Sequence, residues 1–143
     1  MLGVVSHQLG QSERAVDLIR KALIVNPDYD QAHSNLGNIF REIGRFDEAV
    51  NSYQKSLALK PDSAEVHNNL GLTFKNLGRL GDAITNYQMA LSIKPKSAQV
   101  YSNLGSVLME LGQLDERESS YNVGLIPKTT PPAQRGGGVA GWG

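Results

Sequence analysis

The chain has 143 residues and carries 14 Lys and Arg residues against 14 Asp and Glu residues, so its formal net charge is zero. Because binding to a polyanion depends on surplus Lys and Arg, this balance argues against a nucleic-acid partner and against a charged membrane surface. The absence of cysteine excludes disulfides, thiolate metal sites and a cysteine nucleophile. No apolar run is long enough to span a bilayer and no secretory signal is recognisable, so we expect a soluble, cytoplasmic protein.

The sequence repeats with a period of 34 residues. Glycines, prolines and aromatic or large aliphatic residues recur on this step, as in the series Gly10, Gly44, Gly78 and Gly112, the series Pro27, Pro61 and Pro95, and the series Ile19, Tyr53, Tyr87 and Tyr121. A fixed period of this length indicates a repeat protein, in which each unit must stack on its neighbours to bury its apolar face.

Each period predicts two helices. Apolar residues follow helical spacing over 64–77 and again over 80–93. Gly78 is expected to end the first helix, because glycine adopts the left-handed conformation without a steric clash. Gly71 lies inside the first helix, where glycine costs about 1 kcal/mol, and we expect Ala83 to face it across a close helix contact. The unit is therefore predicted to be an antiparallel helix pair.

The repeats divide the chain into five segments in order. These are a partial first repeat at 1–29, complete repeats at 30–63 and 64–97, a divergent last repeat or cap at 98–126, and a disordered tail at 127–143. The first repeat begins inside its first helix, which is expected to leave Leu2, Val4 and Val5 open for self-association. The last repeat has Arg117 and Glu118 where the other repeats have apolar residues, so its second helix is either a polar-faced cap or poorly docked.

The two complete repeats resemble the tetratricopeptide repeat. The resemblance rests on the pattern Asn35, Leu36, Gly37, Phe40, Gly44, Ala49, Tyr53 and Pro61, and on its repetition at Asn69, Leu70, Gly71, Phe74, Gly78, Ala83, Tyr87 and Pro95. It extends from Met1 to about Ile126. It implies an all-α fold, a right-handed superhelical solenoid whose first helices line a concave groove.

Asparagine recurs in the predicted groove, at Asn35, Asn69 and Asn103. Because an asparagine amide can donate to a peptide carbonyl and accept from a peptide N–H, such a row can bind the backbone of an extended peptide. The simpler alternative is that these asparagines only solvate or cap the helices. The resemblance places further groove residues on the same face, and the candidate peptide-binding set is Gln31, Asn35, Asn38, Asn68, Asn69, Lys75, Asn76, Gln99, Asn103 and Ser106.

Two functions from different classes are compatible with this pattern. The first is a protein-interaction scaffold that binds a peptide in the groove. The second follows from a resemblance of the asparagine row to the repeat region of O-linked N-acetylglucosamine transferases: the chain would be the substrate-recognition segment of a larger glycosyltransferase-like enzyme. Binding of a chaperone tail is disfavoured, because Ser34, Gln99 and Asn103 stand where that class of repeat has cations for a terminal carboxylate.

No catalytic, metal or cofactor site is predicted. His33 and His67 occupy equivalent places in successive repeats, with Tyr101 third in the series, which favours a role in helix packing over metal binding. Nucleophile, base and orienting carboxylate do not converge in any recognisable motif. We therefore expect a binding protein whose partner is a protein or peptide.

Overall fold

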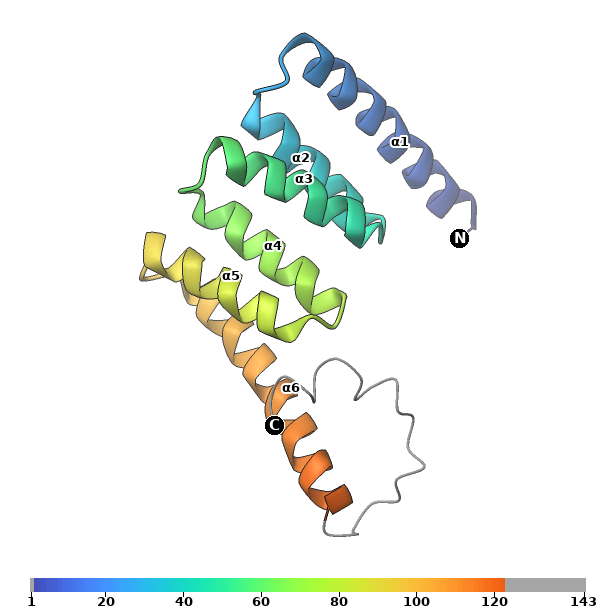
Figure 1. The fold of residues 1–143 in the computed structure, drawn as a ribbon. Coiled ribbons are helices and arrows are strands. Elements are labelled where there is room, and N and C mark those ends of the chain that lie inside the picture. The colour runs from blue at the N-terminus through green and yellow to red at the C-terminus, as the bar shows by residue number, and fades with distance from the viewer. Residues whose placement is uncertain (1, 123–143) are drawn as a thin grey trace.

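The computed structural model describes residues 2–122, with side chains for residues 7–119. Over this range the chain forms six α-helices and no strand, which confirms the all-α prediction (Figure 1). The helices are α1 (Leu2–Val25), α2 (Asp30–Glu42), α3 (Phe46–Leu59), α4 (Ala64–Asn76), α5 (Leu80–Ile93) and α6 (Ala98–Asn122). The predicted disordered tail, 127–143, and the side chains of Leu2, Val4 and Val5 lie outside the described part. Among the described helices, none is long and apolar enough to cross a membrane.

The two central repeats are helix hairpins, formed by α2 with α3 and by α4 with α5. Each hairpin turns at a glycine with positive φ, 82° at Gly44 and 76° at Gly78. The backbone N–H of Gly44 donates to the carbonyl of Arg41, and the N–H of Arg45 donates to the carbonyl of Phe40. Gly78 and its neighbours repeat this arrangement. Because these bonds satisfy the last carbonyls of the first helix, the glycine ends that helix as predicted.

An arginine after each turning glycine fixes the turn. The guanidinium of Arg45 lies 4.8 Å from the centre of the Phe40 ring and pairs with Glu48 on the next helix. The guanidinium of Arg79 lies 4.6 Å from the Phe74 ring and pairs with Asp82 at 2.7 Å. These arginine clamps bind the end of one helix to the start of the next by a cation–π contact and an ion pair.

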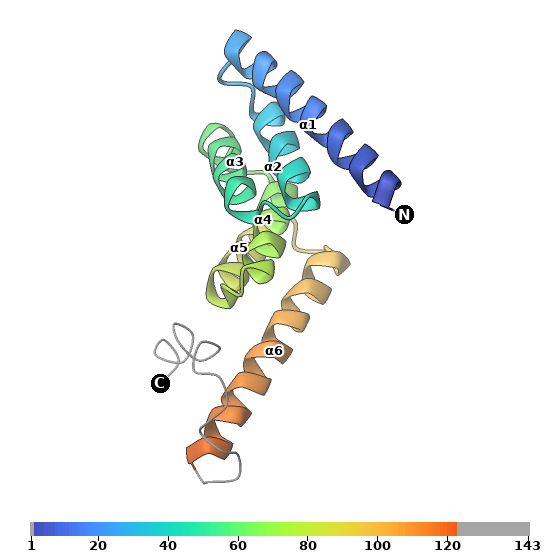
Figure 2. The ribbon, with the colours of Figure 1, turned by 90° about the vertical axis from the view of Figure 1, so that its right-hand side faces the viewer.

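The terminal repeats do not form hairpins, which corrects the sequence prediction. Helices α1 and α6 run straight through Gly10 and Gly112, the residues in phase with the two turning glycines. The clamp is missing there, because Gln11 and Gln113 replace the arginine and because serine and leucine replace the phenylalanine in the first and last repeats. Without the clamp, helix continuation is favoured. The predicted second helix of the last repeat therefore extends α6 beyond the hairpins, at the opposite end of the stack from α1 (Figure 2).

The core lies inside and between the hairpins, where large side chains of one helix meet glycines of the other. A Cβ atom at Gly71 would lie 2.6 Å from Cε1 of Tyr87, and one at Gly37 would lie 2.6 Å from Cε1 of Tyr53. Both tyrosines are fully buried. The residue that packs on Gly71 is thus Tyr87 and not, as predicted, Ala83, which is buried one turn earlier on α5.

Substitutions at equivalent glycines test this packing. Gly71→Ala should destabilise the protein by about 1–2 kcal/mol, because the overpacking of the buried Tyr87 ring outweighs the gain in helix propensity. Gly105→Ala should instead stabilise it by up to about 1 kcal/mol, because nothing lies within 4 Å of the added atom. Urea denaturation of the two variants measures the difference. Equal effects of the same sign would contradict the contact.

Candidate functional site

The first helices of the repeats, α2, α4 and α6, are joined by asparagine side chains. Nδ2 of Asn69 on α4 donates to Oδ1 of Asn38 on α2 at 3.2 Å. Nδ2 of Asn103 on α6 donates to Oδ1 of Asn68 on α4 at 3.0 Å. We call these four residues the amide row. Since a side-chain amide has two N–H groups and a carbonyl oxygen, each donor of the row keeps a second N–H and its oxygen for another partner.

The core residue Tyr53 holds the first pair of the amide row, Asn38 and Asn69, in place. The hydroxyl of Tyr53 donates to Oδ1 of Asn38 at 2.5 Å and accepts from Nε of Arg41 at 3.3 Å. Because the Tyr53 ring is held against Gly37, this hydroxyl fixes the Asn38 amide in position. The sequence did not reveal the role of Tyr53, since the period shows only that it is a packing residue.

The second pair of the amide row, Asn68 and Asn103, has no such hydrogen bond from a tyrosine hydroxyl. Leu72 and Lys75 on α4 stand in phase with Asn38 and Arg41, so the Tyr87 hydroxyl is buried without a hydrogen-bond partner among the described residues. Burial, with a smaller contribution from the carboxylate of Glu110, raises the pKa of Tyr87 to about 12. The ammonium of Lys75 instead donates to Oγ of Ser106 at 2.8 Å and lies 3.7 Å from Glu110.

Two cavities open beside the amide row. The larger, of about 340 Å³ between α4 and α6, is lined by Ala64, Glu65, Asn68, Asn69, Lys94, Ser97, Gln99 and Val100. The smaller, of about 50 Å³ between α2 and α4, is lined by Asp30, Gln31, Ser34, Asn38, Ser56, Lys60, Ser63, Glu65, Val66 and Asn69. Both cavities thus lie near the N-terminal ends of the helices that form the groove.

Sequence reasoning missed the loop residues of these cavities. Lys60 and Lys94 are one period apart, as are Ser63 and Ser97. Ser63 and Ser97 also accept hydrogen bonds from backbone N–H groups in the first turns of α4 and α6, at 3.3 Å in both helices. The 34-residue period is the sequence signal that marks these four residues, but the resemblance points only to residues of the first helices.

The structure brings most of the predicted groove residues together. Eight of them form the amide row, line a cavity or join α4 to α6: Gln31, Asn38, Asn68, Asn69, Lys75, Gln99, Asn103 and Ser106. Asn35 accepts a hydrogen bond from Gln31 at 3.0 Å and, like Asn76, is exposed and lines neither cavity. The peptide-binding role of the whole set stays a prediction.

The histidines are held by the loops that precede their helices. Nε2 of His33 donates to the carbonyl of Pro27, and Nε2 of His67 donates to the carbonyl of Pro61, both at 3.0 Å. These bonds fit the predicted packing role. Over the described residues, no group of three or more metal-ligating side chains comes together.

Comparison with protein-family models gives matches over most of the chain. A model described as TPR repeat matches residues 37–78 and 73–112, and a model described as Tetratricopeptide repeat matches residues 1–29. No curated protein matches the chain significantly.

Several solved structures share the fold. TTC0263, a thermophilic TPR protein of Thermus thermophilus, is 30% identical with a TM-score of 0.67, over 73% of this chain and 53% of that one. MamA is 25% identical with a TM-score of 0.70, over 85% of this chain and 71% of that one. The first TPR of Spaghetti (RPAP3), solved with an HSP90 peptide, is 18% identical with a TM-score of 0.70, over 77% of this chain and 87% of that one, which shows a shared fold alone. This chain spans about half the length of TTC0263.

The two tyrosines provide a matched test of the site. Tyr53→Phe should destabilise the protein by about 1–2 kcal/mol, because it removes the hydroxyl that donates to Asn38 and accepts from Arg41. Tyr87→Phe should instead stabilise it by about 1 kcal/mol, because the hydroxyl that it removes is buried without a hydrogen-bond partner among the described residues. The pH dependence of stability gives a second test of the same tyrosine.

Burial favours the neutral hydroxyl of Tyr87 in the folded state, whereas in the unfolded chain this hydroxyl ionises at about pH 10. The free energy of unfolding therefore does not depend on Tyr87 ionisation below about pH 10, and it falls as the pH rises towards about 12. Urea unfolding at neutral and alkaline pH should show a smaller alkaline loss in Tyr87→Phe than in the wild type, and an equal loss would contradict the assignment.

Proposed function

Because the chain belongs to the tetratricopeptide-repeat family, we propose that it is a non-catalytic protein-interaction scaffold that binds an extended peptide across α2, α4 and α6. The observation that carries this proposal is the amide row, in which Asn69 and Asn103 each reach the preceding first helix. Their remaining N–H and carbonyl groups have the chemistry to bind a peptide backbone.

The spacing of the row suits an extended ligand. Packed helices lie about 10 Å apart, and an extended chain advances about 3.3 Å per residue. One helix step therefore corresponds to about three ligand residues. In the extended polyproline II conformation, which has three residues per turn and a rise of about 3.1 Å per residue, equivalent asparagines would meet equivalent backbone groups. The ligand is bound mainly through its backbone, with modest selection of its side chains.

The charges of the site favour a ligand that is not a terminal carboxylate. The one cation of the predicted set, Lys75, is engaged by Ser106 and Glu110. Lys60 and Lys94 line the two cavities beside the amide row, but the smaller cavity also contains Asp30 and Glu65, and the larger also contains Glu65. A carboxylate bound there would therefore meet no surplus of positive charge. This supports internal segments or loops of a partner protein as ligands, in preference to acidic C-terminal tails.

The second candidate is the substrate-recognition segment of a larger O-linked glycosyltransferase-like enzyme. It rests on the asparagine series at Asn35, Asn69 and Asn103 alone. It requires the same peptide-binding surface, with the catalytic domain on another part of the parent protein. Nucleotide-sugar-binding sequence contiguous with the repeats in the parent reading frame would distinguish it from a separate scaffold.

To test peptide binding, peptides that bind the wild-type protein are first selected from a displayed random library. Each selected peptide is then titrated against the wild type and the variants. The triple variant Asn35→Ala, Asn69→Ala and Asn103→Ala should bind about 100-fold more weakly, because three hydrogen bonds of about 1 kcal/mol each are lost. The affinity of the wild type should change little with salt, since neutral amides make the contacts.

A matched control removes three amides from the second helices, through Asn51→Ala, Gln54→Ala and Gln88→Ala. These side chains are exposed on α3 and α5, and the control should keep the wild-type affinity. Circular dichroism establishes that both triple variants fold. Wild-type affinity in a folded groove variant would refute the proposed binding surface.

A further inference from the structure

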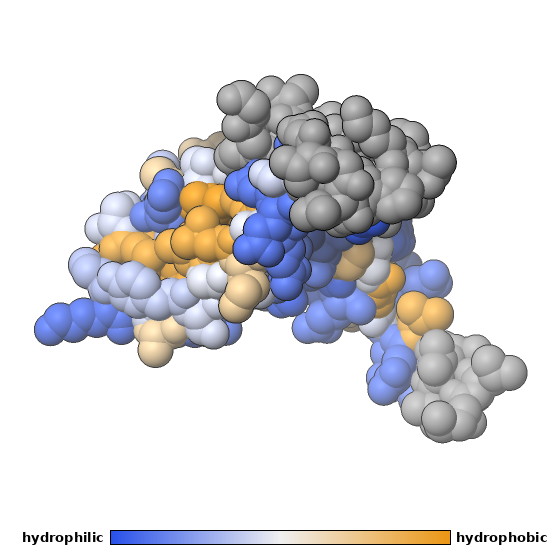
Figure 3. All heavy atoms as spheres, turned by 90° about the horizontal axis from the view of Figure 1, so that it is seen from below, coloured by the Kyte–Doolittle hydropathy of each residue, from blue (hydrophilic) through white to orange (hydrophobic). Residues whose placement is uncertain are grey.

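Each end of the solenoid lacks one helix of a hairpin, and the kind of helix that is missing at one end is present at the other. The first part of α6 is a first helix without the second helix that covers α2 and α4 in the hairpins. Its uncovered face includes Tyr101 and Leu108, which are 55% and 52% exposed, and Gly105, where an added Cβ would meet nothing within 4 Å. The latter part of α1 is, conversely, a second helix without its first helix. Figure 3 views the stack from the α6 end and shows hydrophobic residues gathered on that surface.

We propose that α6 of one copy of this chain packs antiparallel on α1 of a second copy. In each hairpin a glycine of the first helix contacts the large residue 16 positions later, as Gly71 contacts Tyr87. Ile19 has the same phase as Tyr87. The register of the hairpins therefore places Gly105 of one copy against Ile19 of the next, so that α6 and α1 complete one repeat between them.

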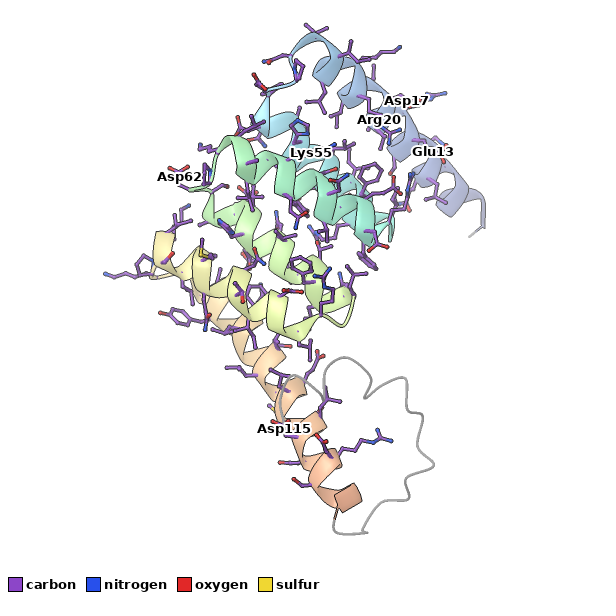
Figure 4. All side chains as sticks on the ribbon, in the orientation of Figure 1. Glu13, Asp17, Arg20, Lys55, Asp62 and Asp115 are labelled. Atoms are coloured by element: carbon purple, nitrogen blue, oxygen red, sulfur yellow. The ribbon has the colours of Figure 1, made fainter. Side chains whose placement is uncertain are left out.

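This register brings suitable groups together. It places Met109, which is 67% exposed, opposite Ala15, which lines an open cavity of about 610 Å³ between α1 and α2. It also places Glu110 opposite Arg14. Helix α6 carries four acidic residues and one arginine, a net charge of −3, whereas α1 carries three basic and two acidic residues, a net charge of +1. Figure 4 labels Glu13, Asp17 and Arg20 on α1 and Asp115 on the projecting part of α6.

The chain's own C-terminal segment is a poorer cover for this face. If α6 folded back at Gly112, Arg117 would take the place of Ala83, which is fully buried in α5. Burial of that charge, with Glu118 beside it, would be costly. On the straight helix, at 100° per residue, these two side chains lie about 120° and 140° from Gly105 and so remain away from a second copy.

The contact joins different surfaces of the two copies. Because α1 and α6 lie at opposite ends of the stack (Figure 1), each added copy presents a new α6 for the next. Association of this kind gives open chains that continue the solenoid, and their length rises with concentration. This inference does not depend on peptide binding in the groove.

Engineered cysteines test the contact without interference, because the chain has no native cysteine. The contact line runs along α6 through Gly105 and along α1 through Ile19. In the proposed register Gln8 and Glu116 face each other, each within about 20° of this line around its own helix axis, whereas Asp17 points away from it by about 160°. A mixture of the single variants Gln8→Cys and Glu116→Cys should form a disulfide-linked dimer at least about tenfold faster than a mixture of Asp17→Cys and Glu116→Cys, because assembly raises the effective thiol concentration.

A second variant tests the face by obstruction. Gly105→Phe should fold as the wild type does, since nothing lies within 4 Å of the added Cβ, but it should stay at the monomer mass in sedimentation velocity while the mass of the wild type rises with concentration. Three results would overturn the proposal: a wild type that stays monomeric, assembly of Gly105→Phe equal to that of the wild type, or rapid dimerisation of Glu116→Cys alone, which indicates α6 paired with α6.

Discussion

A tyrosine ring packed on a glycine determines the spacing of each helix hairpin. Tyr53 and Tyr87 occupy the space that a side chain would fill at Gly37 and Gly71. The absence of a Cβ lets the two helices approach closely, and the fully buried ring fills the space between them. The hairpins then stack so that α2, α4 and α6 lie side by side. The amide row depends on this arrangement, because Asn38 is held by the hydroxyl of the same Tyr53.

The arginine clamp decides which repeats become hairpins. Both repeats with an arginine after the glycine turn there, and both repeats with glutamine at that place continue as a straight helix. Glycine alone is therefore insufficient, since Gly10 and Gly112 lie inside helices. The loss of the clamp at both ends leaves uncovered helix faces there. The same substitutions that shorten the groove thus create the surfaces through which we propose that copies associate.

The sequence predicted the central fold well because period, helical spacing and turning glycines all agree over 30–97. It failed at the ends, where the period preserved Gly10 and Gly112 but the clamp residues had changed, and the clamp is an interaction in space that no single position reveals. The groove was predicted to the level of its first-helix residues. Hydrogen bonds between repeats, such as Asn69 with Asn38, and the unpartnered hydroxyl of Tyr87 depend on side-chain reach, which spacing does not give.

A double-mutant cycle between Gly71 and Tyr87 measures the glycine–tyrosine contact most directly. Gly71→Ala, Tyr87→Leu and the double variant are compared with the wild type by urea denaturation, which gives the free energy of unfolding of each. If the ring is what excludes a Cβ at position 71, the penalty of Gly71→Ala disappears once the smaller leucine replaces the ring. The account predicts a coupling energy of at least about 1 kcal/mol between the two sites. Additivity of the two single effects within about 0.3–0.5 kcal/mol would contradict it.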